Sequence, residues 1–228
     1  MKTSFAQRWA AALVLLALSV PASAAIITFT GGTVVRQSGP NQTTNNSVLW
    51  DDVDYYEEAG FRLDFKPNGA GTAGFATNIG DYYGAGNDVI HGHWATGNFG
   101  GMTEIEITKI GGGTFDLNYF ILTSNTDQGG GPASGNELTY IEGFLNNVST
   151  GAAVLLSPED WGFPATQIFL GSAFDAVDSV RFTVANAVDC FGMDEFFIDQ
   201  PAPGVPEPGS LALAGLALAG LMIRRRRK

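Results

Sequence analysis

The sequence predicts an all-β fold, and three observations support this. Between residues 25 and 199 no stretch keeps the 3.6-residue hydrophobic period of an amphipathic helix. Short segments alternate apolar and polar residues instead: "TEIEITKI" places Ile105 and Ile107 on one strand face and Glu104 and Glu106 on the other. Runs rich in Gly and Asn separate these segments, as turns between short strands do. We therefore expect a β-sandwich domain at 25–199.

The strand-like segments follow one another through this domain. In chain order they are "AIITFT" (25–30), "DYYEEAGFRLDFKP" (54–67, one or two strands), "NDVIHGHW" (87–94), "TEIEITKI" (103–110), "TFDLNYFILTS" (114–124), "ELTYIEGFL" (137–145), "AAVLLS" (152–157), "QIFLG" (167–171), "DSVRFTVAN" (178–186) and "FGMDEFFID" (191–199). About nine or ten antiparallel strands favour a jelly roll over a seven-stranded immunoglobulin-type sandwich.

Residues 1–24 have the pattern of a secretory signal peptide. Lys2 and Arg8 form a positive n-region, 9–20 is a short apolar run, and Ala22 and Ala24 hold the small-residue positions before a cut. We expect a signal helix that is cleaved after Ala24. The alternative is an uncleaved N-terminal anchor.

The C-terminal end combines three segments. Residues 200–209, "QPAPGVPEPG", predict a stiff extended stalk, because proline blocks helix propagation. Residues 210–223 form a 14-residue apolar run, which predicts a short transmembrane helix where a full span needs about 20 residues. A basic cytoplasmic tail, 224–228, follows it and would hold the C-terminus inside; its members are Arg224, Arg225, Arg226, Arg227 and Lys228.

This combination resembles the PEP-CTERM sorting signal of Gram-negative bacteria, with Pro206, Glu207 and Pro208 as its motif. The resemblance implies that a membrane protease-transpeptidase, exosortase, cuts near the motif and releases or re-attaches the protein. It also implies export by the secretion machinery, transient anchoring in the inner membrane, and a final place at the cell surface or in the extracellular matrix. A structural or adhesive role linked to exopolysaccharide and biofilm would follow. The alternative is that the tail is only a permanent anchor.

The domain between the two signals is strongly acidic. All 23 acidic residues and five of the 12 basic residues lie at 25–208, which leaves a net charge of −18. Nucleic acid and anionic lipid are poor partners for such a surface, whereas neutral glycans, cations and basic proteins are compatible with it.

The second half of the domain has a looser resemblance. The segments from "GGTFDLNYFIL" to "CFGMDEFFI" look like the jelly-roll domains of many PEP-CTERM proteins, which are similar in turn to galactose-binding-like and carbohydrate-binding modules. Those modules often hold a structural calcium through carboxylates of the first and last strands. Asp194 fits the last-strand position, but Thr28 and Thr30 stand where the first strand would carry an acid.

Asp194 is also unusual for its place in the strand pattern. Alternation puts it on the face of Phe196 and Ile198, and a buried carboxylate has to be paired, hydrogen-bonded or metal-bound. Two interpretations remain open: an Asp that accepts backbone N–H groups of a neighbouring loop, and a calcium ligand. No other cofactor is expected.

Aromatic residues beside polar ones make a glycan-binding role the main alternative function. Sugars bind by stacking on apolar rings together with hydrogen bonds. Tyr82 and Tyr83 lie in a Gly-rich loop, and Trp94 and Trp161 adjoin polar segments, so these four are candidate glycan contacts.

Catalytic and metal patterns are weak. No Ser lies in G-x-S-x-G and no spacing singles out a carboxylate pair, so we expect no enzyme and rank a hydrolase last. His91 and His93 share one strand face, but a metal site needs a third ligand, and the sequence offers no further His or Cys cluster. The single Cys190 is expected to be a small buried core residue; the alternative is a free thiol that pairs between chains.

Overall fold

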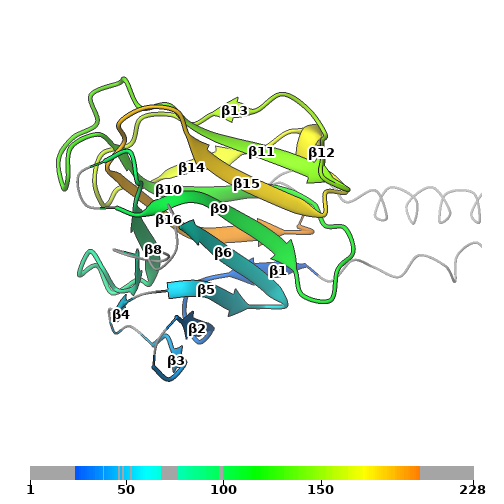
Figure 1. Ribbon diagram of the computed structural model, residues 1–228, viewed down its shortest axis with the longest axis horizontal. Helices are drawn as coiled ribbons and strands as arrows, with labels where there is room; N and C mark the ends of the chain where they lie inside the picture. Colours follow the sequence, from blue (N-terminus) through cyan, green and yellow to red (C-terminus); the bar gives the residue numbers. More distant parts are fainter. Residues whose placement is uncertain are drawn as a thin grey trace, which may run out of the picture.

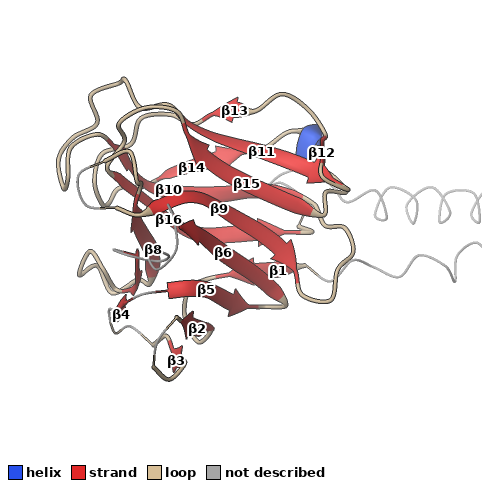
Figure 2. Ribbon diagram, viewed as in Figure 1, coloured by secondary structure: helices blue, strands red, loops and turns tan. Residues whose placement is uncertain are grey.

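The computed structural model describes residues 24–37, 39–45, 47, 49–51, 53–67, 77–97 and 100–200 of the 228-residue chain. In this part the protein is a β-sandwich of two antiparallel sheets, which confirms the all-β prediction (Figure 1). The described helical structure is one 3-10 turn, η1 (Ser172–Phe174), visible as the single blue element in Figure 2.

The first sheet has β16 at its centre. Its strands lie in the order β14 (Thr166–Phe169), β10 (Leu117–Thr126), β16 (Cys190–Ile198), β8 (Val89–His93), β7 (Thr77–Gly80) and β4 (Leu49–Asp51). β1 (Ala25–Ile27) pairs with the C-terminal end of β16, on the same edge where β8 pairs with its N-terminal end. β1 and β8 therefore share one edge of β16. Residues 28–30, which follow β1, and residues 87–88, which precede β8, lie near the middle of this edge.

The second sheet carries the predicted alternation. Its order is β12 (Val148–Ser149), β11 (Thr139–Leu145), β15 (Ser179–Val184), β9 (Met102–Lys109), β6 (Phe61–Pro67), β5 (Val53–Glu58), β2 (Thr33–Arg36) and β3 (Gln42–Thr43), and β13 (Val154–Leu155) also pairs with β11. In β9, Ile105 and Ile107 are buried as expected. Glu106 lies on the opposite face and binds Arg181 Nε at 2.9 Å and Lys66 Nζ at 3.0 Å.

The described residues form sixteen strands, more than the nine or ten expected. One reason is that segment 54–67 turns back at Ala59 and Gly60, whose φ angles of 52° and 84° suit a tight hairpin between β5 and β6. Another is that several strands have only two or three residues, and so short a pairing leaves no periodic pattern in a sequence. From β9 onward the strands of four or more residues alternate between the sheets: β9, β11 and β15 lie in the second sheet, and β10, β14 and β16 in the first. The jelly-roll connectivity itself stays a prediction.

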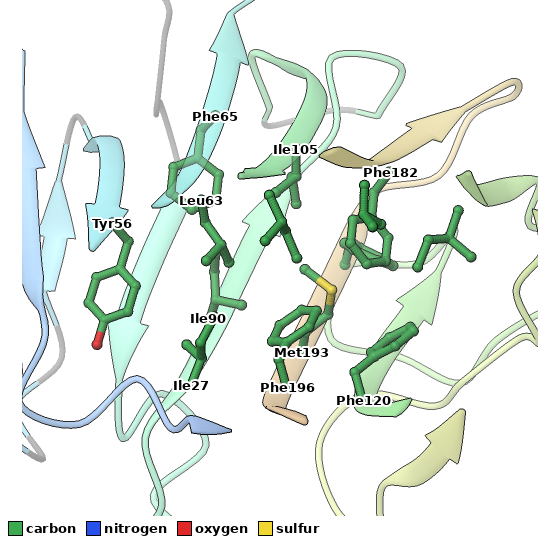
Figure 3. Close-up of a cluster of buried hydrophobic side chains, with 14 of the residues drawn as sticks. Ile27, Tyr56, Leu63, Phe65, Ile90, Ile105, Phe120, Phe182, Met193 and Phe196 are labelled. Atoms are coloured by element: carbon green, nitrogen blue, oxygen red, sulfur yellow. The ribbon is translucent and has the colours of Figure 1, made fainter. Parts of the chain in front are cut away.

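The core fills the space between the two sheets with apolar side chains of both (Figure 3). Phe196 of β16 stacks on Phe120 of β10, with ring centroids 5.4 Å apart, and meets the edge of Phe182 from the opposite sheet at 6.2 Å. All three rings are buried. This packing joins β10 and β16 to β15 of the opposite sheet.

Several predictions lie outside the described residues. They are the signal segment up to residue 23, the stalk beyond Gln200, the apolar segment 210–223 and the basic tail. Within the part of the chain that the structure describes, no helix has the length and apolar character needed to cross a bilayer.

Candidate functional site

An aromatic cluster forms where two loops meet at one end of the first sheet. Tyr82 and Tyr83 come from the loop between β7 and β8, and Trp161 and Phe163 from the loop between β13 and β14. The Trp161 ring lies 5.0 Å from Tyr83 and 5.8 Å from Tyr82, and Phe163 lies 5.7 Å from Tyr83. The structure therefore brings together three of the four residues predicted to contact glycans.

Backbone hydrogen bonds hold the 157–166 loop against β10. Asn125 and Glu159 exchange two backbone bonds of 3.0 and 3.2 Å, and Gly162 N–H donates to the Thr123 carbonyl at 2.9 Å. The loop encloses a groove of about 590 Å³ lined by Pro158 through Thr166. Trp161 and Phe163 keep 38 % and 41 % of their surface exposed, so their rings are accessible beside this groove.

Tyr83 links the cluster to the strands beneath it. Its hydroxyl lies 2.9 Å from His91 Nδ1, 3.3 Å from Thr123 Oγ1 and 3.2 Å from Ser124 Oγ. Burial raises the pKa of this phenol to about 12, so it stays protonated at neutral pH. The hydroxyl fits only because position 192 is glycine: a Cβ on Gly192 would lie 2.5 Å from the Tyr83 oxygen.

Trp94 does not belong to this cluster, and its prediction as a glycan contact is wrong. Its side chain is fully buried and packs against Phe191, with ring centroids 5.3 Å apart. A buried indole presents no face on which a sugar can stack. Trp94 follows β8 on the same face as Ile90, which is also buried in the core, and Phe191 lies on β16, the neighbouring strand of the same sheet.

Asp194 is buried, as the alternation predicted. Its Oδ2 accepts a 2.7 Å hydrogen bond from the side-chain amide of Asn87, in the loop before β8. Its Oδ1 is buried without a hydrogen-bond partner among the described residues. Burial raises the pKa of Asp194 to about 6, and the hydrogen bond from Asn87 partly opposes this rise.

The threonines of the first strand each contact a carboxylate from elsewhere. Thr28 Oγ1 donates to Glu58 at 2.8 Å, and Thr30 Oγ1 donates to Asp88 at 2.6 Å. Asp88 is fully buried, and its charge adds to the raised pKa of Asp194. The second acid near Asp194 therefore comes from the residue before β8, which a search of the first strand could not find. Calcium binding stays a prediction.

We expect acidification from pH 7 to pH 5 to stabilise the protein through Asp194 when calcium is absent. The carboxyl has a pKa near 6 when folded and 3.8 ordinarily, so the folded chain binds the proton more tightly. Its contribution is complete below the ordinary pKa, at about 3 kcal/mol in total from 1.36 kcal/mol per pKa unit, and is lost as pH rises through the folded pKa. About 1.4 kcal/mol of this is gained between pH 7 and pH 5. The measurement is the melting temperature in EDTA at pH 7 and pH 5. The difference between the native chain and Asp194→Asn separates the contribution of Asp194 from that of the other acidic residues.

A bound calcium ion would reverse this dependence. The ion requires an ionised Asp194, so EDTA would lower the melting temperature at pH 7, and acid would release the ion and destabilise the fold. Asp194→Asn would remove the EDTA sensitivity. A melting temperature that EDTA leaves unchanged would favour the hydrogen-bonded carboxyl.

His91, His93 and Cys190 form a second cluster under the aromatic one. Cys190 is buried as expected, and its register partner on β8 is His93. Burial raises the pKa of the Cys190 thiol to about 11, and burial lowers the pKa of His91 far below its ordinary value. The structure thus places a third candidate ligand atom, Cys190 Sγ, beside the two histidines, from a strand almost 100 residues away.

The C-terminal residues match a known family. Residues 204–227 match the PEP-CTERM protein-sorting motif, a stretch that includes Pro206-Glu207-Pro208, the apolar segment and the arginines. No curated protein and no solved structure matches the chain. The resemblance of the tail to this motif is confirmed: the chain carries a PEP-CTERM protein-sorting motif, which supports an exported protein that exosortase sorts.

Proposed function

We propose that this exported exosortase substrate has a structural or adhesive role in an extracellular polysaccharide matrix. The observation that carries the proposal is the sorting motif at 204–227. The domain ahead of it is a rigid β-sandwich with a strongly acidic surface, which suits a passive matrix component better than a nucleic-acid or lipid binder.

A host lacking this chain tests the role. We expect its matrix to hold together less well under shear, and complementation with the native chain to restore cohesion. The measurement is the fraction of cells and polysaccharide released at a fixed shear. Release that is equal with and without the protein would contradict the proposal.

The second candidate function, carbohydrate binding, is favoured by the aromatic cluster. Trp161 and Phe163 present exposed rings beside a groove, and the carboxylates of Glu159 and Asp160 lie in the same lining. Exposed aromatic faces next to hydrogen-bonding groups are the combination that sugars need. Binding through this cluster would also explain how the protein adheres to a polysaccharide.

We expect Trp161→Ala to weaken binding to the host's exopolysaccharide by about two- to tenfold. A stacked ring contributes about 0.5–1.5 kcal/mol, and 1.4 kcal/mol corresponds to a factor of ten. Co-sedimentation with the purified polysaccharide, or a glycan array, measures the effect. Phe169→Ala is the matched control, because Phe169 is also an exposed aromatic residue, 57 % accessible, but contacts Tyr119 rather than the cluster. Equal losses in both variants would remove the cluster as the binding site.

A further inference from the structure

Strands β8 and β16 bring together every imidazole and thiol that the chain possesses. The sequence has two histidines and one cysteine, and one ligand atom from each of His91, His93 and Cys190 lies within 4.8 Å of the others. The antiparallel register causes this: Cys190 lies opposite His93, and Gly192 opposite His91. The side chains at i and i+2 of β8 point to one face, and Cys190 points to the same face.

His91 presents a ring nitrogen that has no hydrogen-bond partner in the part of the chain that the structure describes. Its side chain is fully buried; Nδ1 is occupied by the Tyr83 hydroxyl at 2.9 Å, with Ser124 Oγ at 3.4 Å. Its Nε2 is buried and has no hydrogen-bond partner among the described residues. Tyr82 lies flat on the ring, with centroids 4.3 Å apart and planes 12° apart, and shields it from solvent. A buried nitrogen of this kind is rare in a folded protein unless something binds it.

His93 and Cys190 already stand at a distance suited to one ion. Cys190 Sγ lies 3.6 Å from His93 Nδ1, close to the separation of about 3.5 Å that tetrahedral Zn–N and Zn–S bonds of about 2.1 and 2.3 Å require. Asp189 Oδ1 lies 3.3 Å from the same nitrogen. The three ligand atoms lie within 4.8 Å of one another, so the longest of their separations would have to shorten by about 1 Å around a zinc ion. Rotation of the side chains can supply this movement.

The surrounding groups resemble the outer shell of metal sites. A ligating histidine usually has its other ring nitrogen fixed by a hydrogen bond, which sets the orientation of the ring. Tyr83 holds His91 in this way, and its hydroxyl is fixed in turn by Thr123 and Ser124. Two imidazoles and a thiolate favour zinc or copper over calcium and magnesium, which bind oxygen.

We propose that His91, His93 and Cys190 bind a single Zn²⁺ ion, with its fourth position left to water or an external ligand. The proposal does not depend on the matrix role or on carbohydrate binding. The ion would join β8 to β16 directly beneath Tyr82 and Tyr83, and so would stiffen the support of the aromatic cluster.

Cobalt(II) titration of the full-length chain, purified without a histidine tag, tests the site. We expect one equivalent to bind, with a thiolate-to-cobalt charge-transfer band and visible bands typical of tetrahedral coordination. Zn²⁺ should displace the cobalt and raise the melting temperature. Because the chain holds no other His or Cys, no second site can give the thiolate band.

Variants assign the ligands. Cys190→Ser should abolish the charge-transfer band, and His91→Gln and His93→Gln should each weaken cobalt affinity at least tenfold. Tyr83→Phe, which removes the hydroxyl that orients His91, should weaken it about tenfold. Asp194→Asn, on the same strand, is the control and should bind cobalt as the native chain does. Circular dichroism reports whether each variant is folded.

One measurement needs no substitution. Zn²⁺ should slow the reaction of the Cys190 thiol with an alkylating reagent in the native chain. A rate that Zn²⁺ does not change would overturn the proposal, as would cobalt binding that survives in Cys190→Ser, because the ion would then lie on surface carboxylates. A site that takes copper(I) and refuses both Zn²⁺ and Co²⁺ would overturn the assignment to zinc.

Discussion

Replacing Pro206-Glu207-Pro208 with three alanines is expected to strand a larger, unprocessed form of the protein in the inner membrane of its host. The motif lies inside the matched sorting segment, and two prolines flanking a carboxylate keep the backbone extended, as a protease cleft requires. The described sandwich closes its core with residues 27–198, so its melting curve should not change. Mass spectrometry of the mature C-terminus measures processing.

Deleting residues 224–228 gives a contrasting variant. The apolar segment has only 14 residues, and without the cations that mark the cytoplasmic side it should be retained more weakly in the membrane. The two variants therefore separate recognition by exosortase from anchoring. A native product that still ends at Lys228, in a host with the sorting machinery, would show that the tail is only an anchor.

Truncating Phe196 to alanine is expected to cost about 3–5 kcal/mol of unfolding free energy, the usual cost of removing a buried phenylalanine. Phe196 is fully buried and contacts Phe29, Phe120 and Phe182, so its loss opens a cavity between the two sheets. Against a typical stability of about 5–15 kcal/mol, this change is large. Urea unfolding followed by tryptophan fluorescence measures it.

Phe169→Ala is the matched control for this loss as well. Phe169 sits on β14 at the sheet edge and is 57 % exposed, so its truncation leaves no cavity and should cost less than about 1 kcal/mol. Similar losses for Phe169 and Phe196 would mean that the core described here is not the centre of the cooperative unit.

Local pattern explains where prediction from sequence succeeded. Alternation in 103–110 correctly placed Ile105 and Ile107 in the core, because a strand has only two faces and one must be apolar. The same rule buried Asp194. Trp94 also obeys this rule, because it shares the strand face of Ile90, four residues earlier, and both side chains are buried; its prediction as a glycan contact rested on its polar neighbours instead.

The sequence by itself determined the all-β class, the acidic surface and the sorting tail, because each depends on residues close together in the chain or on composition alone. Only the tertiary structure decided which side chains of different strands and loops contact one another. Pairing of β8 with β16 placed Cys190 beside His93, and the close contact that Gly192 permits let Tyr83 reach His91. The contact between Cys190 and His93 follows from strand register over a separation of almost 100 residues, which no local pattern encodes.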